Sequence, residues 1–234
     1  MPPLSIVLPV LNEAQGIAHV LHALAPLRTR GAQVIVVDGG STDETVSRAC
    51  QALKESKGAA PWQVITHVPP GRANQMNAGA QQALAPLLLF LHADTLLPPQ
   101  ADTLVMGALR GGKHQWGRFD VLIQGRHPML RVVGALMNLR SRLSGIATGD
   151  QALFLTRAAF DAVGGFPAQP LMEDIEISKR LLRLSRPACL WARVITSGRR
   201  WEARGVWRTM LLMWSLRFAY WRGVSPQRLA QRYR

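Results

Sequence analysis

The sequence predicts an α/β fold with a mainly parallel central sheet flanked by helices. Apolar segments of strand length alternate with helical segments through the first half of the chain. These strands are almost continuously apolar, which is typical of parallel sheets covered on both faces. The chain has 234 residues, of which 48% are hydrophobic, so it can bury a core and is not disordered as a whole.

Four strands and three helices are expected in the first half. Pro9 marks the end of the first strand, because proline cannot donate to a sheet ladder. Ser-Thr-Asp-Glu at 41–44 predicts the cap and first turn of the second helix, which is expected to run to about Lys57. The expected strands are 4–11, 33–38, 62–68 and 87–91, and the expected helices are 14–28, 41–57 and 72–84.

The second half is less regular. Short apolar runs predict strands at 119–123, 152–155 and 190–195. A helix is expected over 172–184, opening on Glu173 and Asp174.

Charge divides the chain into two unequal parts. Residues 1–109 carry 6 basic and 7 acidic residues, whereas residues 110–234 carry 22 basic and 7 acidic residues, within a total net charge of +14. A basic half of this kind suits nucleic acid, an anionic membrane surface or a phosphate-bearing small molecule. Plain solubility and an arginine-rich composition are the alternative explanation.

Several function classes are disfavoured by missing motifs. Two cysteines cannot build a disulfide scaffold or a four-thiolate zinc site, and they favour a reducing cytoplasm. No signal peptide or spanning apolar segment is expected. The dinucleotide fingerprint, the P-loop and the Gly-x-Ser-x-Gly elbow are also missing, which argues against oxidoreductases, P-loop enzymes and ordinary serine hydrolases.

Polar residues follow the expected strands, where ligands bind in parallel sheets. Asn12 and Glu13 follow the first strand, Asp38 the second, and His92 and Asp94 the fourth. Asp94 suits either a hard cation or the cap of the following turn. His92, two residues earlier, is expected on the same side of the strand, as a further ligand, a phosphate contact or a satisfied buried imidazole.

Four segments, in this order and spacing, resemble the family 2 glycosyltransferases, which have the GT-A (nucleotide-diphospho-sugar transferase) fold. The resemblance covers residues 4–205. More narrowly, segments 71–77, 148–151 and 199–202 resemble a bacterial subgroup labelled as arsenosugar-biosynthesis-type glycosyltransferases. The four family segments are Pro-Val-Leu-Asn-Glu at 9–13, Val-Asp-Gly-Gly-Ser-Thr-Asp at 37–43, His-Ala-Asp at 92–94 and Met-Glu-Asp at 172–174.

The resemblance implies sugar transfer from a nucleoside diphosphate donor, here a UDP-sugar, to an acceptor hydroxyl. It implies a divalent metal, Mg²⁺ or Mn²⁺, at Asp94, with His92 in the first position of the usual Asp-x-Asp motif. The residues it assigns to the nucleotide are Pro9, Asn12, Glu13, Asp38, Arg72 and Asn77.

The resemblance also implies that Asp174 is the general base of an inverting transfer. The alternative for Asp174 and Glu173 is the ordinary preference of helix N-termini for acids. Arg199 and Arg200 would stabilise the leaving diphosphate, and Trp201 would stack on a sugar or base. The residues implied for acceptor or diphosphate are Gly149, Asp150, Gln151, Glu173, Arg199, Arg200 and Trp201.

The last part of the chain, 206–234, is expected to be a basic amphipathic helical segment following a transferase domain of 1–205. Within that domain, 1–110 would bind the nucleotide and 111–205 the acceptor. Residues 206–221 predict a mostly apolar helix that packs on the domain, joins a second subunit as a homodimer, or lies on the inner face of a membrane. The acceptor is then a small molecule or is linked to a lipid.

Two other enzyme classes stay open, namely a polyprenyl-phosphate glycosyltransferase at the membrane surface and a nucleotidyltransferase on a similar sheet. A nucleic-acid-binding module is disfavoured, because acids at the strand ends repel phosphates when no metal is bound.

Overall fold

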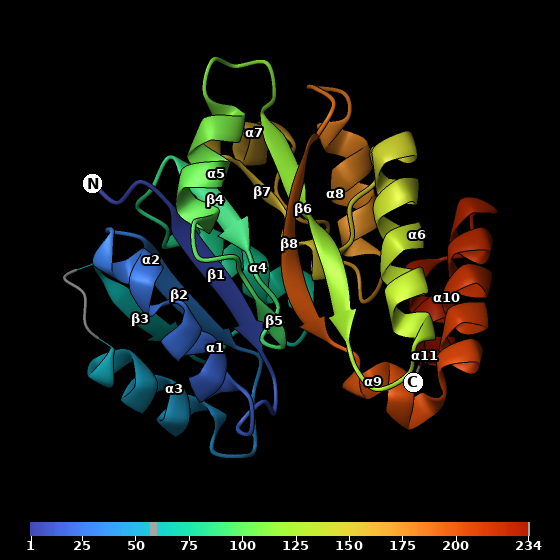
Figure 1. Ribbon diagram of the computed structural model, residues 1–234, viewed down its shortest axis with the longest axis horizontal. Helices are drawn as coiled ribbons and strands as arrows, with labels where there is room; N and C mark the ends of the chain where they lie inside the picture. The colour runs from blue at the N-terminus through green and yellow to red at the C-terminus, as the bar shows by residue number, and fades with distance from the viewer. Residues whose placement is uncertain (57–59, 234) are drawn as a thin grey trace.

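The computed structural model describes residues 1–56 and 60–233. One eight-stranded sheet runs through it in the order β3-β2-β1-β4-β7-β6-β8-β5 (Figure 1). β1 (Ser5–Val10), β2 (Gln33–Asp38), β3 (Trp62–Ile65) and β4 (Leu87–Phe90) are parallel to one another. β7 (Phe154–Thr156) is antiparallel to β4 and to β6 (Trp116–Gln124). β8 (Ala188–Ser197) is parallel to β6 and antiparallel to β5 (Thr95–Leu96).

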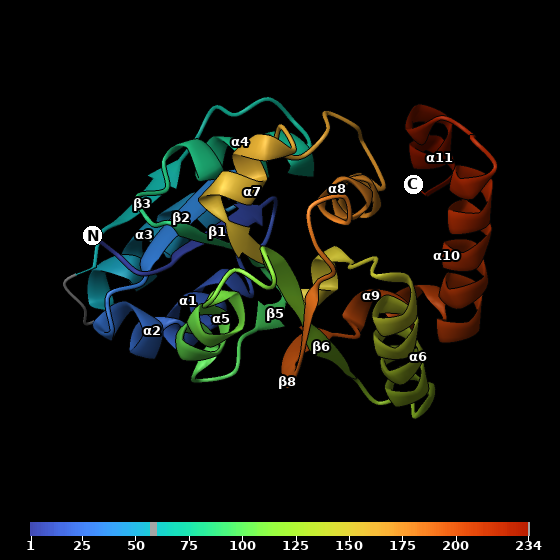
Figure 2. The ribbon, with the colours of Figure 1, turned by 90° about the horizontal axis from the view of Figure 1, so that it is seen from above.

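Helices cover both faces of the sheet, as the apolar strands require. Ile6 and Leu8 of β1 face α1 (Ile17–Ala23), α3 (Thr45–Glu55), α5 (Ala101–Leu109) and α6 (Met129–Ser144). Val7 faces the opposite way, toward α4 (Arg72–Gln81), α7 (Arg157–Ala162) and α8 (Glu173–Leu181). Figure 2 shows these two helical layers on either side of the sheet.

The expected α/β fold is therefore confirmed, although several elements differ locally from those expected. Pro9 lies within β1 and not at its end. The single helix expected over 14–28 is two, α1 and α2 (Ala25–Thr29), because Pro26 in the first turn of α2 cannot continue α1. The second helix ends at Glu55, and Lys57, the end expected from the sequence, lies outside the described residues.

The chain closes with three helices, α9 (Arg199–Arg204), α10 (Val206–Trp221) and α11 (Pro226–Tyr233). Leu216 of α10 and Leu229 of α11 are fully buried against Met172 and Ile175, at the start of α8. Tyr220 also donates a hydrogen bond to Glu176 of α8 at 3.2 Å. The expected helix 206–221 thus packs one of its faces on the domain. Among the described residues, no helix is long and apolar enough to cross a membrane.

Candidate active site

Two loops at the carboxyl ends of β1 and β2 hold each other in place. Asn12, whose backbone is left-handed (φ 53°), accepts a hydrogen bond from the amide of Thr42 at 2.9 Å, and its own amide donates to Ser41 Oγ at 2.9 Å. The carboxylate of Asp38 accepts from the amides of Gly40 and Ser41, each at 3.0 Å. These bonds order the loops that carry the expected nucleotide-binding residues Asn12 and Asp38.

The side chain of Gln75, on α4, bridges the ends of the same two strands. Its side-chain Nε2 donates to the carbonyl oxygens of Val10 and Val37, both at 2.8 Å. Gly39 lets it approach, since a Cβ at Gly39 would lie 2.9 Å from the Gln75 carboxamide. From the sequence alone Gln75 is only one member of the segment 71–77, because its partners are remote in the chain.

A cleft of about 260 Å³ lies next to these loops, lined by Glu13, Asp94 and Arg199 among others. Glu13, largely buried, accepts from Nη2 of Arg199 at 3.4 Å and from Nη2 of Arg200 at 3.2 Å. The two guanidinium groups are about half exposed (56% and 55%). The structure therefore joins one residue expected at the nucleotide with two expected at the diphosphate.

Among the described residues, the carboxylate of Asp94 keeps oxygen positions open to a hard cation. The hydroxyl of Thr95 contacts its carboxylate at 3.4 Å, at the long limit of a hydrogen bond. Within the described residues, no group of three His, Cys, Asp or Glu side chains could hold a metal by itself. A single carboxylate fits Mg²⁺ or Mn²⁺ when substrate phosphate oxygens complete the coordination.

His92 does not accompany Asp94, which corrects the expectation that both lie on one side of a strand. β4 ends at Phe90, so the alternation of side chains stops before His92. The ring donates from Nδ1 to Asp150 at 3.1 Å and packs closely against Gly149, where a Cβ would come within 2.2 Å of Nε2. His92 thus lines a different hollow from Asp94.

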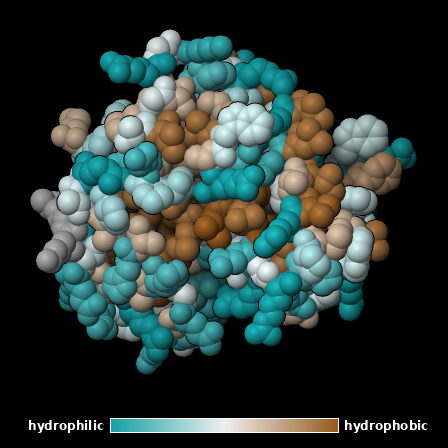
Figure 3. Space-filling model, viewed as in Figure 1, coloured by the Kyte–Doolittle hydropathy of each residue, from teal (hydrophilic) through white to brown (hydrophobic). Residues whose placement is uncertain are grey.

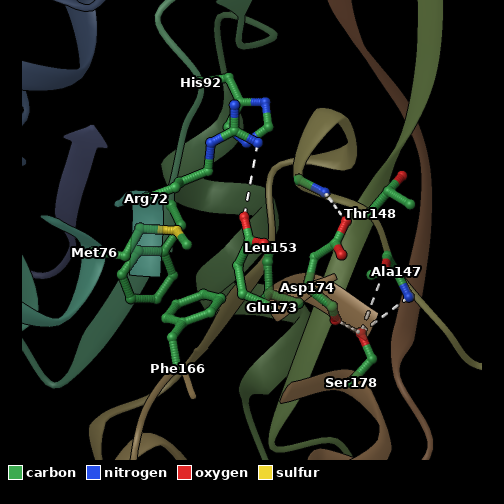
Figure 4. A pocket seen from close by; sticks show the side chains of 12 residues that line it. Arg72, Met76, His92, Ala147, Thr148, Leu153, Phe166, Glu173, Asp174 and Ser178 are labelled. Carbon is green, nitrogen blue, oxygen red and sulfur yellow. Dashed lines mark hydrogen bonds and ion pairs between the residues drawn. The ribbon is translucent and has the colours of Figure 1, made fainter. Parts of the chain in front are cut away.

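That second hollow contains Asp174, at the start of α8 (Figure 4). Its carboxylate accepts from the amide of Gly149 at 3.1 Å and from the amide of Ile175 at 2.8 Å. Burial, and then the charge of Glu173, raise the pKa of Asp174 to about 6, against the hydrogen bonds and Arg72 that lower it. A carboxylate with this pKa is able to accept a proton near neutral pH.

Positively charged groups surround the acids of this pocket. Arg72, at the start of α4, points to Glu173 with 3.8 Å between Nη1 and Oε1 (Figure 4). Burial opposes the ionisation of Asp150, but the hydrogen bond and charge of His92, together with Arg72 and Arg200, hold the pKa of Asp150 below its usual value. Arg72 and Arg200 therefore both act electrostatically on Asp150, the partner of the pocket residue His92, although they lie far apart in the chain.

The backbone that presents Glu173 and Asp174 is strained. Met172 has a φ of +66°, a left-handed conformation that is uncommon for a long side chain. Its side chain is held among Ile175, Leu216 and Leu229, so α10 and α11 support this conformation. Strain of this kind is maintained by surrounding packing and is frequent at functional sites.

Four other residues expected at the site are occupied by hydrogen bonds or packing within the fold. Asn77 donates to the carbonyl of Phe166 at 2.8 Å and accepts from its amide at 2.9 Å, so its amide group is already paired. Gln151 is fully buried, where it caps its own 3₁₀ turn at Thr148. Pro9 is buried in β1, and Trp201 packs against the core from α9.

The mixed sheet with helices on both faces has counterparts in solved glycosyltransferases. TarS of S. aureus has a TM-score of 0.65 at 17% identity, over 84% of this chain and 60% of that one. The mannosyltransferase PcManGT from Pyrobaculum calidifontis, in complex with GDP-Man and Mn²⁺, has a TM-score of 0.68 at 20% identity, over 99% of this chain and 69% of that one. The fold is thus that of the GT-A glycosyltransferases.

The sequence comparison identifies the family. The profile of glycosyl transferase family 2 matches residues 5–159, and the chain belongs to that family. A PGL/p-HBAD biosynthesis glycosyltransferase of Mycobacterium tuberculosis is 32% identical over 170 residues, which are 70% of this chain and 63% of the relative. The poly-beta-1,6-N-acetyl-D-glucosamine synthase of Staphylococcus epidermidis is 24% identical over 87% of this chain and 53% of its own length. The chain therefore spans less than two thirds of these relatives.

Proposed function

We propose that the protein transfers a sugar from a nucleoside diphosphate sugar to an acceptor hydroxyl with inversion, and that Asp174 is the general base. The observation that carries the proposal is the Asp174 carboxylate, fixed by two backbone amides in a pocket that raises its pKa to about 6. Membership of glycosyl transferase family 2 supports the reaction class.

The transfer is a single displacement. The acceptor oxygen attacks the anomeric carbon, its proton passes to a carboxylate oxygen of Asp174, and the bond from that carbon to the diphosphate breaks with its electron pair. Asp174 is held at the pocket wall, so its proton-accepting oxygen needs no reorganisation during this step. One base is sufficient, because the diphosphate leaves without being protonated.

The donor is assigned to the cleft beside the first two strands. Asn12, Glu13 and Asp38 would surround the nucleoside there, while Pro9, buried within β1, would support the strand that precedes Asn12 and Glu13. Arg199 and Arg200, which are half exposed and held by Glu13, would stabilise the charge that develops on the diphosphate. A divalent cation at Asp94 would supply Lewis-acid stabilisation of the same charge.

The reacting hydroxyl of the acceptor is assigned to the hollow of Asp174, which encloses about 10 Å³ and so admits one hydroxyl group and not a whole acceptor. Gly149 and Gln151 shape the turn that orients the base, while Asp150, paired with His92, and Glu173, near Arg72, are available to bind acceptor hydroxyls. Asn77 is left out of this assignment, since the backbone of Phe166 occupies its amide group.

A thermal-shift comparison of nucleotide sugars, with and without Mn²⁺, tests the donor site. TarS has been solved with UDP-GlcNAc and glucosyl-3-phosphoglycerate synthase of Mycobacterium tuberculosis with UDP and Mg²⁺, which supports a UDP-sugar as the donor here. At a hundred times its Kd, the correct donor should raise Tm by roughly 5–10 °C. Equal shifts with all nucleotides, or none with any nucleotide sugar, would contradict the proposal.

The pH dependence of transfer tests the base. Asp174 acts only when ionised, and its pKa is raised to about 6. We expect kcat to be level above pH 7 and to fall about tenfold for each pH unit below about 6, while the donor Kd changes little. A kcat that is level down to pH 4.5 would exclude a base with this pKa.

We also assign the protein to the cytoplasm, where the two free cysteines stay reduced. The acceptor is a small molecule or a lipid-linked one. The narrower resemblance to arsenosugar-biosynthesis-type enzymes stays a prediction.

A further inference from the structure

Two helices expose long apolar stripes on the basic half of the protein. Successive members are separated by four, three and four residues in α6 and by four, three, four and three residues in α10, which places each set on one helical face. Every member has at least 46% of its surface exposed, up to 71% for Leu143 and 76% for Trp221. The stripe of α6 consists of Val132, Leu136, Leu139 and Leu143, and that of α10 of Trp207, Leu211, Trp214, Phe218 and Trp221.

These stripes are not needed to hold the fold together. The opposite face of α6 packs through Leu130 and Val133 into the main core, and the opposite face of α10 packs through Leu216 on α8. Figures 1 and 2 both place α10 beside α6, and Figure 3 shows hydrophobic side chains gathered on the side of the molecule where α6 lies. An exposed apolar surface of this extent indicates a binding site.

The charge on the same helices has one sign. Within α6, α10 and α11 there is no aspartate or glutamate, and seven arginines are present, with an eighth, Arg222, directly after α10. Five of these are exposed, and in the described part of the chain none of the five has an acidic partner. The exposed arginines are Arg131, Arg208, Arg222, Arg228 and Arg232.

We propose that the stripes of α6 and α10, with the exposed arginines around them, bind the surface of an anionic lipid bilayer. Three tryptophans and a phenylalanine in one stripe suit the headgroup region, where aromatic rings are enriched. Arginines beside the rings extend to lipid phosphates while the rings enter the acyl boundary. Charge decides against a second copy of the chain, because a two-fold interface would bring these arginines against one another without any acid.

This surface lies next to the proposed catalytic pocket. α10 rests on Met172 and Ile175, which flank Glu173 and Asp174 in the sequence. A bilayer bound to the exposed stripe of α10 would therefore lie one helix diameter, roughly 10 Å, from the start of α8. This consequence rests on the proposed function and favours an acceptor carried by a lipid.

Vesicle sedimentation of the full chain tests the membrane contact. We expect binding to vesicles of phosphatidylcholine with about a third of phosphatidylglycerol, weak binding to phosphatidylcholine alone, and release at high salt. The exposed tryptophans should show a blue-shifted fluorescence on binding.

Two double substitutions separate the apolar and the charged contributions to vesicle binding. Trp214→Ser with Phe218→Ser should lower the vesicle partition coefficient at least about tenfold. Arg208→Gln with Arg222→Gln should lower it about fivefold for each arginine. The matched controls are Leu84→Ser, at a 58% exposed leucine away from this surface, and Arg110→Gln with Lys113→Gln, all of which should bind like the unaltered protein.

Three results would overturn the proposal. One is the absence of binding to anionic vesicles. Another is equal loss of binding in the control variants. The third is a dimer in light scattering that Trp214→Ser with Phe218→Ser dissociates, which would assign the face to a second copy. Asp174→Asn should bind vesicles normally, so a failure of the proposed chemistry is distinguishable from a failure of the membrane contact.

Discussion

Replacing Asp174 by Asn is expected to lower kcat by about 10²–10⁴-fold, the range that general base catalysis contributes. The amide of Asn cannot accept the acceptor proton, but it has the size of the carboxylate and keeps an oxygen for the amide of Gly149 or Ile175. The donor binds in the neighbouring cleft, so its Kd should change less than about threefold.

The control for this variant is Asp161→Asn, at an exposed aspartate on α7 outside both hollows. It should have the kcat and the donor Kd of the unaltered protein. Single-turnover measurements at saturating donor would show that the Asp174→Asn defect lies in the chemical step. If Asp174→Asn transfers sugar at the normal rate, the base is another residue and the proposed mechanism is wrong.

The strands that build the nucleotide side of the fold were predictable, because their signal is local. β1, β2 and β4 are continuous apolar segments, and the polar residues after β1 and β4, namely Glu13, His92 and Asp94, line the clefts. α6 was not predicted, because Val132, Leu136 and their exposed neighbours obscure the one-sided pattern of a helix that packs on a sheet. A helix whose outer face is also apolar lacks the signal on which the prediction depends.

The pairings within the candidate site could not be predicted from the sequence. Glu13 and Arg199 meet across 186 residues, and His92 and Asp150 across 58. Neither contact has a local pattern, since each depends on how the second half of the sheet folds back on the first. The family motifs predicted that these residues belong to one site. They did not predict that His92 lines one hollow with Asp174 while Asp94 lines another with Glu13.

Because Asp94 lines the cleft assigned to the donor, we expect a second large effect on kcat when Asp94 is replaced. Asp94→Ala should lower kcat about 10²–10³-fold, because it removes the carboxylate assigned to the cation that neutralises the leaving diphosphate. It should also remove the part of the donor thermal shift that depends on Mn²⁺, while any shift without metal is retained. Asp161→Ala, the exposed control on α7, should change neither measurement.

Comparison with His92→Ala distinguishes the two members of the His-Ala-Asp motif. His92 contacts Asp150 and Gly149 next to the base, so its loss should lower kcat but leave the response of donor binding to Mn²⁺ intact. The opposite result, with Mn²⁺ dependence lost in His92→Ala and kept in Asp94→Ala, would move the cation from Asp94 to the pocket of Asp174. The thermal shift caused by the donor could also be independent of metal in the unaltered protein, in Asp94→Ala and in His92→Ala. That result would assign the neutralisation of the diphosphate to Arg199 and Arg200, which Glu13 already holds at the cleft.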